Sequence, residues 1–256
     1  MGMGRSTGFG WQAWLFAGVF CGMILWELPA SWVAWAVDRA SAHRWVLANV
    51  QGSFWNGSAE LACRYGHQFP VGHFPGRWQW AVRPVWGALA FRLQGTDPLN
   101  REPVAGWMGW KTWHLDGGRL VVPATVLVGL GPPFNTLGLA GRLELRWKGM
   151  DWDRLGNMPL SPVALQLDMT ETESRLTQVR PLGEYRIRMQ WGPLGGTLNV
   201  DTPKGPLMIT GQGTLGPSGR LVFRGQAVAA ESDKPRLAGL LGILGRQDGS
   251  VTDLQY

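Results

Sequence analysis

The sequence predicts an all-β protein in which an N-terminal transmembrane helix precedes a curved, mostly antiparallel meander sheet, shaped as an open trough or a partial barrel. Three observations support this fold class: an apolar stretch of membrane-spanning length, many short runs of alternating apolar and polar residues after it, and glycines and prolines between those runs. Apolar residues make up 45% of the 256 residues and charged residues only 16%, which excludes a disordered chain.

The apolar stretch runs from Phe9 to Leu28, and Gln12 and Glu27 are its only strongly polar residues. About 20 apolar residues suffice for a helix to cross the hydrocarbon layer of a bilayer. Tryptophans stand at both ends, as in the interfacial belts of membrane helices: Trp11, Trp14, Trp26, Trp32 and Trp35. We predict four parts: a cytoplasmic tail (1–8), a transmembrane helix (9–28), a membrane-proximal linker or helix (29–49) and a periplasmic β domain (50–256).

The orientation of this single-pass span follows from Arg5, the one charged side chain in the short tail. Because positive residues stay on the cytoplasmic side, the large C-terminal part is predicted to be periplasmic. A cleaved signal peptide is the competing interpretation, since Ala34-Trp35-Ala36 has the pattern of a cleavage site. The stretch is longer than a usual signal core of about 7–15 residues and contains bulky tryptophans, which favours the anchor.

After the apolar stretch, residues 33–47 are predicted to form a helix that continues from the membrane or lies against it. From Val50 the period is that of strands, as in Leu143-Glu144-Leu145-Arg146-Trp147. This alternation indicates a sheet with one covered face and one wet or charged face. The predicted strands are 58–64, 77–82, 88–94, 107–115, 118–122, 141–148, 161–169, 184–191, 196–201, 207–212 and 220–227.

The segments between strands carry their own signals. Gly-x-Leu triplets recur without a fixed period, which indicates hairpin punctuation and not a solenoid repeat. The stretch 123–133 breaks the alternation and is predicted to connect two halves of the sheet, with a short helix or turn. Leucines recur at helical spacing within 235–244, which predicts a short amphipathic helix that closes one end of the sheet.

The formal net charge of +6 raises the question of nucleic-acid binding. Lysines and arginines are scattered singly, without a dense basic run, so we predict no nucleic-acid partner. Anionic lipid headgroups or an acidic partner surface fit the charge at least as well. Cys21 lies inside the apolar stretch and Cys63 outside it, so no disulfide is predicted.

Catalytic and cofactor motifs are missing from the sequence, including a P-loop, a dinucleotide fingerprint and a Gly-x-Ser-x-Gly elbow. His67 and His73 frame a loop, but no further ligand stands at a spacing that completes a metal site. Glu171 and Glu173 lie in a polar stretch predicted to be a solvated hairpin tip, whereas general acid–base work needs a carboxylate in an apolar pocket. We therefore predict no catalytic residue, no metal and no cofactor.

Tryptophan is unusually frequent, with 16 residues, and many of them fall in predicted strands. In Trp78-Gln79-Trp80 the two indoles share one face of a strand. The plainer interpretation is a sheet core rich in tryptophan. The sharper interpretation is an apolar groove for lipid or for a helix of a partner, which would leave several indoles partly exposed.

Three segments carry a family resemblance: Leu28-Pro29-Ala30-Ser31-Trp32, Val50-Gln51-Gly52-Ser53-Phe54-Trp55-Asn56-Gly57-Ser58-Ala59, and Trp78-Gln79-Trp80-Ala81-Val82-Arg83-Pro84. They resemble the type II secretion system protein N family, also called general secretion pathway protein N, and the similarity of layout covers nearly the whole chain. Its recurrent positions map to Gly52, Trp55, Gly57, Trp80 and Pro84. The resemblance implies structural work there: a tight turn at the glycines, packing of Trp55 with Trp80, and a strand end at Pro84.

The resemblance implies an accessory, non-enzymatic inner-membrane subunit of the machinery that exports folded proteins from the periplasm across the outer membrane. The implied partners are other inner-membrane and periplasmic subunits of type II secretion, together with inner-membrane lipids. The alternative is an envelope lipid-binding or lipid-handling protein that uses an apolar β trough. An enzyme is the third hypothesis.

Overall fold

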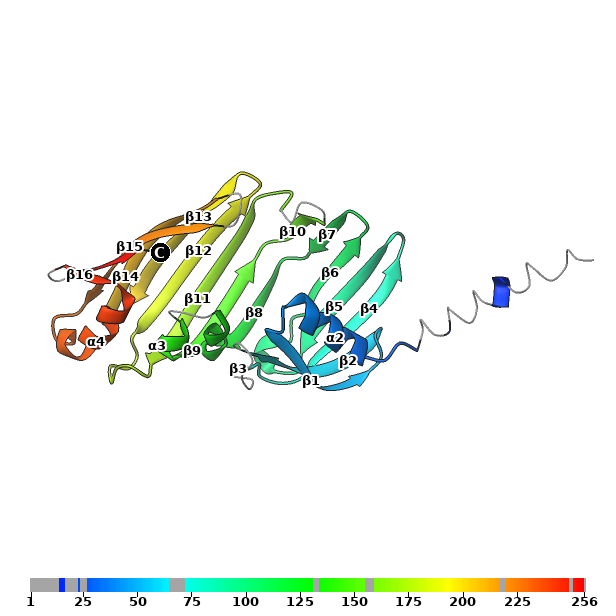
Figure 1. The fold of residues 1–256 in the computed structure, drawn as a ribbon, viewed down its shortest axis with the longest axis horizontal. Helices are drawn as coiled ribbons and strands as arrows, with labels where there is room; N and C mark the ends of the chain where they lie inside the picture. The colour runs from blue at the N-terminus through cyan, green and yellow to red at the C-terminus, as the bar shows by residue number, and fades with distance from the viewer. Residues whose placement is uncertain are drawn as a thin grey trace, which may run out of the picture.

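Two groups of antiparallel strands form the body of the protein, and the computed structural model describes residues 14–16, 23, 27–64, 72–130, 134–154, 159–216, 220–248 and 251–255 (Figure 1). The N-terminal sheet contains β1 (Trp45–Gly52), β2 (Asn56–Cys63), β3 (Gly72–His73), β4 (Trp78–Val85), β5 (Ala88–Gly95), β6 (Val104–Gly109), β7 (Thr112–Leu115) and β10 (Met150–Asp153). The C-terminal sheet contains β8 (Gly118–Pro123), β9 (Leu139–Trp147), β11 (Val163–Ser174), β12 (Gly183–Gly192), β13 (Gly195–Lys204), β14 (Leu207–Leu215), β15 (Leu221–Ala229), β16 (Arg246–Asp248) and β17 (Val251–Gln255).

The order of the strands is that of a meander. The N-terminal sheet runs β1-β2-β4-β5-β6-β7-β10, with β3 beside β2, and the C-terminal sheet runs β16-β17-β15-β14-β13-β12-β11-β9-β8. Short hairpins join most neighbours, so the predicted antiparallel all-β fold is confirmed. The described strands end at β1 on one side and β16 on the other, which leaves the sheet open.

The two sheets meet at a seam made of two interrupted strands. β7 leads into β8, and β9 leads into β10, with a two-residue break in each case. The pairing register continues across the break, because Leu115 lies opposite Met150 on one side and Gly118 lies opposite Trp147 on the other. The seam therefore joins the two sheets edge to edge, and the strands follow one another in a single twisted series (Figure 1).

One face of this series is apolar and the other is polar, as the alternation predicts. Directly opposed residues on neighbouring strands share a face. Leu167 lies between Leu145 and Ile187 on the apolar face. The adjacent residue Asp168 lies between Glu144 and Arg186 on the polar face.

Helices cover the apolar face along the edge drawn at the bottom of Figure 1, which we call the lower edge. The helix α4 (Lys234–Leu244) buries Leu237 and Leu240 against Leu207 and Ala227. The helices η2 (Ala124–Leu130) and α3 (Phe134–Leu137) follow β8, and η2 packs over a second buried cluster that includes Leu143. A short helix, η1 (Pro98–Asn100), lies between β5 and β6. Burial of these side chains is the main stabilising term of the fold.

The helix predicted at 33–47 is wrong in its C-terminal part. The helix α2 (Ser31–Ala40) ends before Ala42 and His43, which both adopt positive φ angles of 50° and 64°. Strand β1 then begins at Trp45, which lies opposite Cys63 of β2. Apolar runs of this length fit a buried strand as well as a helix, and the pairing with β2 decides between them.

Two further predictions differ from the structure. The run 107–115 forms the end of β6, a turn at Trp110 and Lys111, and β7, because the chain reverses into a hairpin. The connector at 123–133 leads from β8 to β9, and these two strands are neighbours in the C-terminal sheet, so it does not link two sheet halves. The short helix predicted in this stretch is confirmed as η2. The helix predicted at 235–244 is confirmed as α4.

The N-terminal predictions fall mostly on residues that the structure does not describe. The tail at 1–8 and most of the predicted span at 9–28 lie outside the described residues. Among the helices that are described, none has both the length and the apolar character that a membrane crossing requires.

Candidate functional site

Three of the family-motif positions meet at the β1–β2 hairpin. Gly52 has a φ of 92°, which favours glycine, and it lies opposite Gly57. A Cβ atom on Gly57 would lie 2.3 Å from Cζ2 of Trp80. The Trp80 ring thus occupies the space that the missing side chain leaves, and its indole Nε1 donates a hydrogen bond to the carbonyl of Phe54 at 3.1 Å.

The other two motif positions, Trp55 and Pro84, lie on either side of this hairpin contact. Trp55 packs edge-on against Phe54, with ring centroids 5.1 Å apart, and its carbonyl accepts a hydrogen bond from the backbone amide of Val82. Pro84 stands one residue before the end of β4, beyond the stretch that pairs with β2, where a missing N–H breaks no β2–β4 pairing. The structure therefore brings Gly52, Gly57 and Trp80 together and places Pro84 farther along β4.

A strip of the apolar face lies beyond the helices. Cross-strand pairing places Met108 opposite Trp113, and Trp113 opposite Trp152. Trp152 in turn contacts Trp191 edge-on, with ring centroids 5.1 Å apart. Met108 is 37% exposed and Trp113 is 46% exposed. We call these four residues the apolar strip, and apolar surface of this kind can bind acyl chains or an apolar partner segment.

The polar face carries a row of ion pairs across the strands. The Nε atom of Arg119 lies 2.6 Å from a Glu144 oxygen, and the Nε atom of Arg186 lies 2.6 Å from an Asp168 oxygen. Arg146 bridges the row, because it lies beside Glu144 and 3.3 Å from Asp168. The hydrogen bond from Arg119 lowers the pKa of Glu144. Burial opposes ionisation of Asp168, but hydrogen bonds from Arg186 and Gln166 hold its pKa below the usual value.

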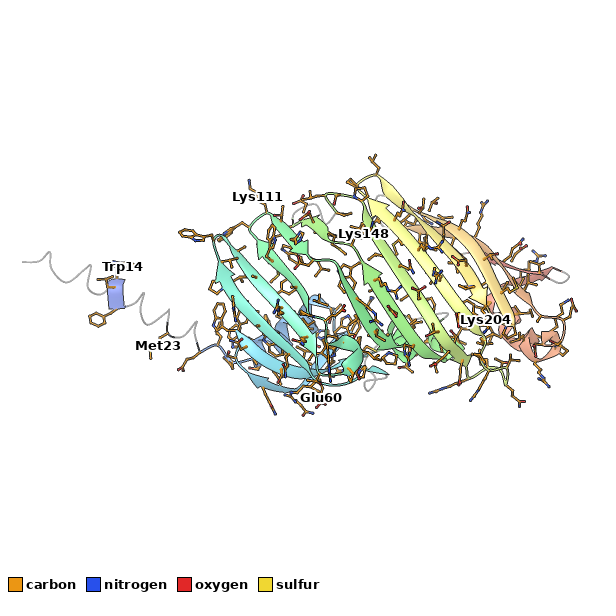
Figure 2. The ribbon with its side chains drawn as sticks, turned by 180° about the vertical axis from the view of Figure 1, so that it is seen from behind. Trp14, Met23, Glu60, Lys111, Lys148 and Lys204 are labelled. Atoms are coloured by element: carbon orange, nitrogen blue, oxygen red, sulfur yellow. The ribbon has the colours of Figure 1, made fainter. Side chains whose placement is uncertain are left out.

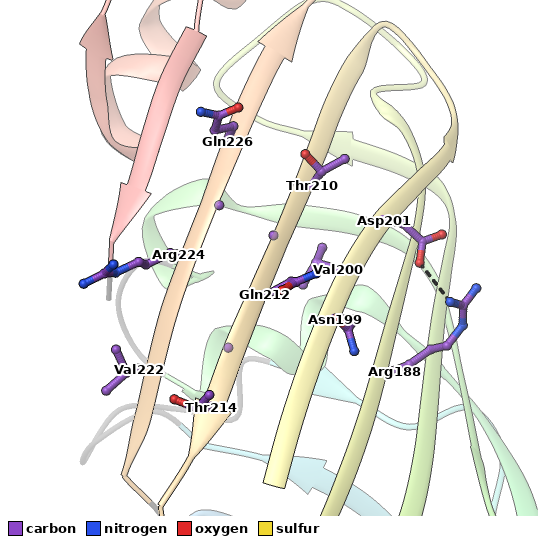
Figure 3. A pocket seen from close by; sticks show the side chains of 13 residues that line it. Arg188, Asn199, Val200, Asp201, Thr210, Gln212, Thr214, Val222, Arg224 and Gln226 are labelled. Carbon is purple, nitrogen blue, oxygen red and sulfur yellow. Dashed lines mark ion pairs between the residues drawn. The ribbon is translucent and has the colours of Figure 1, made fainter.

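Farther along the polar face, a depression of about 940 Å³ lies over β13, β14 and β15 (Figure 3). Half of its side chains are uncharged and polar, such as Asn199, Thr210 and Gln212. Arg188 and Asp201 form an ion pair of 3.6 Å at its side. Hydrogen-bonding groups spread over a wide, open surface of this type suit contact with another protein better than enclosure of a small molecule.

His114 forms a charged cluster at the seam that the sequence analysis missed. Its Nδ1 lies 2.7 Å from Asp151 and its Nε2 lies 3.1 Å from Asp116. The hydrogen bond to Asp151 is the main cause that raises the pKa of His114. Trp107 stacks on the imidazole with ring centroids 5.7 Å apart. Asp151 is far away in the chain, and only the strand register could have revealed this contact.

The residues that were considered for chemistry lie apart. His67 is outside the described residues, and the backbone of His73 pairs with Ala62 in β3. The hairpin tip predicted around Glu171 and Glu173 is wrong, because both residues lie within β11, where a bulge at Glu171 lets the strand continue. In the described part of the chain, no group of three or more potential ligands is arranged to hold a metal ion.

Fold and surfaces together define an all-β protein that presents two broad faces, one apolar and one charged, on an open sheet. The chain belongs to the type II secretion system protein N family, whose sequence model matches residues 43–253. Type II secretion system protein N of Klebsiella pneumoniae is 24% identical over 243 residues, which cover 91% of this chain and 89% of that protein. No solved structure matches the chain. The family resemblance of the sequence is confirmed, and the chain is a component of type II secretion.

Proposed function

We propose that this chain is an accessory, non-enzymatic, single-pass subunit of the inner membrane that supports export of folded proteins by the type II secretion machinery. One observation carries the proposal: the residues that match the family model are nearly the same residues that form the two β-sheets. The match covers 43–253, and the strands run from Trp45 to Gln255. In this proposal the segment 9–28 holds the chain among inner-membrane lipids, and the sheet lies in the periplasm. No cofactor is required.

Other inner-membrane and periplasmic secretion subunits are the proposed partners of the polar face. The row of ion pairs from Arg119 to Arg186 fixes the charged side chains of this face in place, so the surface is preorganised for binding. The depression over β13 to β15 lies on the same face. The motif residues Gly52, Trp55, Gly57, Trp80 and Pro84 are proposed to act structurally, by holding the β1–β2 hairpin against β4.

The proposal is tested in the bacterium that carries this chain. Deletion of its gene is expected to reduce secretion of type II cargo and to leave folded cargo in the periplasm, and the full chain should restore secretion. A photo-crosslinking amino acid at Gln212, in the depression, should capture another secretion subunit. The matched control is the same amino acid at Leu215 of the same strand, whose side chain lies on the apolar face. Unchanged secretion, together with no captured subunit at Gln212, would contradict the proposal.

The apolar strip favours a second candidate function, the binding or handling of envelope lipid. This candidate is supported by the exposure of Met108 and Trp113. The apolar side chains of the same face that lie along the lower edge are covered by helices. A photo-crosslinker at Met108 should then capture phospholipid in cells, and one at Gln190 on the polar face should not. Equal capture at the two positions, or none at Met108, would remove this candidate.

A further inference from the structure

The edge opposite the helices carries a row of solvent-exposed apolar side chains. We call it the upper edge; it lies at the top of Figure 1 and consists of the turns that follow β4, β6, β10, β12 and β14. Trp86 is fully exposed, Leu194 is 94% exposed and Trp110 is 82% exposed. Leu160, at 53%, and Val85, at 48%, add to the row. Alternate strand ends of a meander point the same way, so these five residues share one edge.

Exposure of this degree is concentrated at the upper edge. Among the described large apolar side chains, only four are more than four-fifths exposed. Three of them are Trp86, Trp110 and Leu194, and the fourth is Trp14, in the segment predicted to enter the membrane. Exposure of a tryptophan ring to water at a turn tip does not stabilise the protein. The ring and its N–H suit the boundary between acyl chains and headgroups.

The charges of the upper edge are mostly positive. Exposed cations stand in three of its five turns, at Lys111, Arg154 and Arg220, and the exposed Arg83 lies two residues before the end of β4. The backbone amide of Arg154 donates to the carbonyl of Lys111 at 2.9 Å, which holds two of these turns side by side. The sequence of these turns contains no carboxylate, and Asp151 and Asp153 lie at the adjoining end of β10. Figure 2 shows Lys111 on this edge and Lys204 on the lower edge.

A small depression lies between the first two turns. It has a volume of about 300 Å³, and its lining includes Leu89, Met108 and Trp110, with Arg154 at its side. An apolar lining beside one guanidinium matches the upper part of an anionic phospholipid, where acyl chains meet a phosphate.

From these observations we infer that the upper edge is a membrane-docking surface, which inserts its apolar turn tips into the interface of a bilayer that contains anionic lipid. The contact is separate from the predicted anchor at 9–28. Cations attract the headgroups, and Trp86, Trp110 and Leu194 enter the boundary with the acyl chains. The contact goes beyond the proposed role in secretion, because it assigns a lipid surface as the partner of this edge.

The test uses the full chain with a fluorophore whose emission shifts to the blue in apolar surroundings. Leu194→Cys carries the label on the upper edge, and Leu99→Cys, at an exposed leucine of the lower edge, is the matched control. Cys21→Ala is added to both variants, and the buried Cys63 stays unlabelled. Each protein is reconstituted in liposomes of phosphatidylcholine, with or without phosphatidylglycerol. A second arm adds separate phosphatidylglycerol vesicles, which detects docking onto another membrane.

The label at 194 should shift to the blue when phosphatidylglycerol is present, in the same bilayer or in the added vesicles, and the label at 99 should not. Replacement of Lys111 and Arg154 by glutamine should weaken binding of the added vesicles, or the shift within one bilayer, by about fivefold for each cation removed. Lys204→Gln on the lower edge should leave it unchanged.

Three results would overturn the inference. The first is a label at 194 that stays as wet as the label at 99 in both arms. The second is an equal shift at both positions, which reports non-specific adsorption. The third is a shift at 194 that needs another secretion subunit and no lipid, which would make the upper edge a protein interface.

Discussion

The two edges of the sheet end their strands in opposite ways. At the lower edge the chain folds helices back over the apolar face, so that Leu237 and Leu207 are almost completely buried. At the upper edge the side chains of Trp86 and Leu194 are exposed to solvent. Because one sheet carries both edges, the difference separates two uses of apolar residues. Those of the lower edge hold the fold together, and those of the upper edge are available for contact.

The largest expected effect separates these two uses directly. Leu237→Ala removes a side chain with no exposed surface and should lower the free energy of unfolding by about 2–5 kcal/mol. Leu194→Ala removes a side chain that is 94% exposed and should change it by less than about 0.5 kcal/mol. Urea unfolding of the full chain in detergent measures both. Similar losses for the two variants would break the comparison between the edges.

A second variant tests the β1–β2 hairpin, where Gly52, Gly57 and Trp80 meet between the two edges. In Gly57→Ala the new Cβ would lie 2.3 Å from the Trp80 ring, so the ring must move, and the free energy of unfolding should fall by about 1–3 kcal/mol. Gly239→Ala is the matched control, because a Cβ there meets no atom within 4 Å in helix α4, and it should stabilise by about 0.5–1 kcal/mol. A neutral Gly57→Ala would show that Trp80 does not need this glycine.

The predicted strands show how far sequence reasoning reaches. Alternation in 141–148 and 184–191 gives both the strands and their faces, because the side-chain period of a strand is local. The leucine spacing of 235–244 likewise finds α4. Strand β1 was missed because the choice between helix and strand at Trp45 depends on its distant partner Cys63.

Sites were harder to predict than strands, for related reasons. The cluster of His114 with Asp151 depends on the pairing register of β7 with β10, which no spacing in the sequence encodes. Trp86 and Trp110 were counted among the tryptophans of the β region, and only the turns they occupy reveal that they are exposed. Sequence patterns describe which face a side chain takes within a strand, but not what covers that face.

The acid side of the pH profile tests the row of ion pairs on the polar face. Glu144 and Asp168 have lowered pKa values, so their contribution to stability is present above about pH 4, where they are also ionised in the unfolded chain. It is lost as the pH falls through the lowered values. Asp168→Asn should lower the free energy of unfolding by about 1–2 kcal/mol at neutral pH and by nearly nothing in acid. A cost that does not change with pH, measured by urea unfolding, would assign the effect to packing.

The smallest expected effect concerns the seam, where His114 contacts Asp151 and stacks on Trp107. The pKa of His114 is raised, mainly by its hydrogen bond to Asp151, so the stability it contributes is fully present below about pH 6.5 and is lost as the pH rises through the raised value. His114→Gln should therefore lower the free energy of unfolding by less than about 1 kcal/mol below about pH 6.5, and by less still in mildly alkaline solution. Urea unfolding of both proteins at the two pH values measures this difference. A cost that grows with pH would mean that the neutral imidazole, stacked on Trp107, is the form that holds the seam.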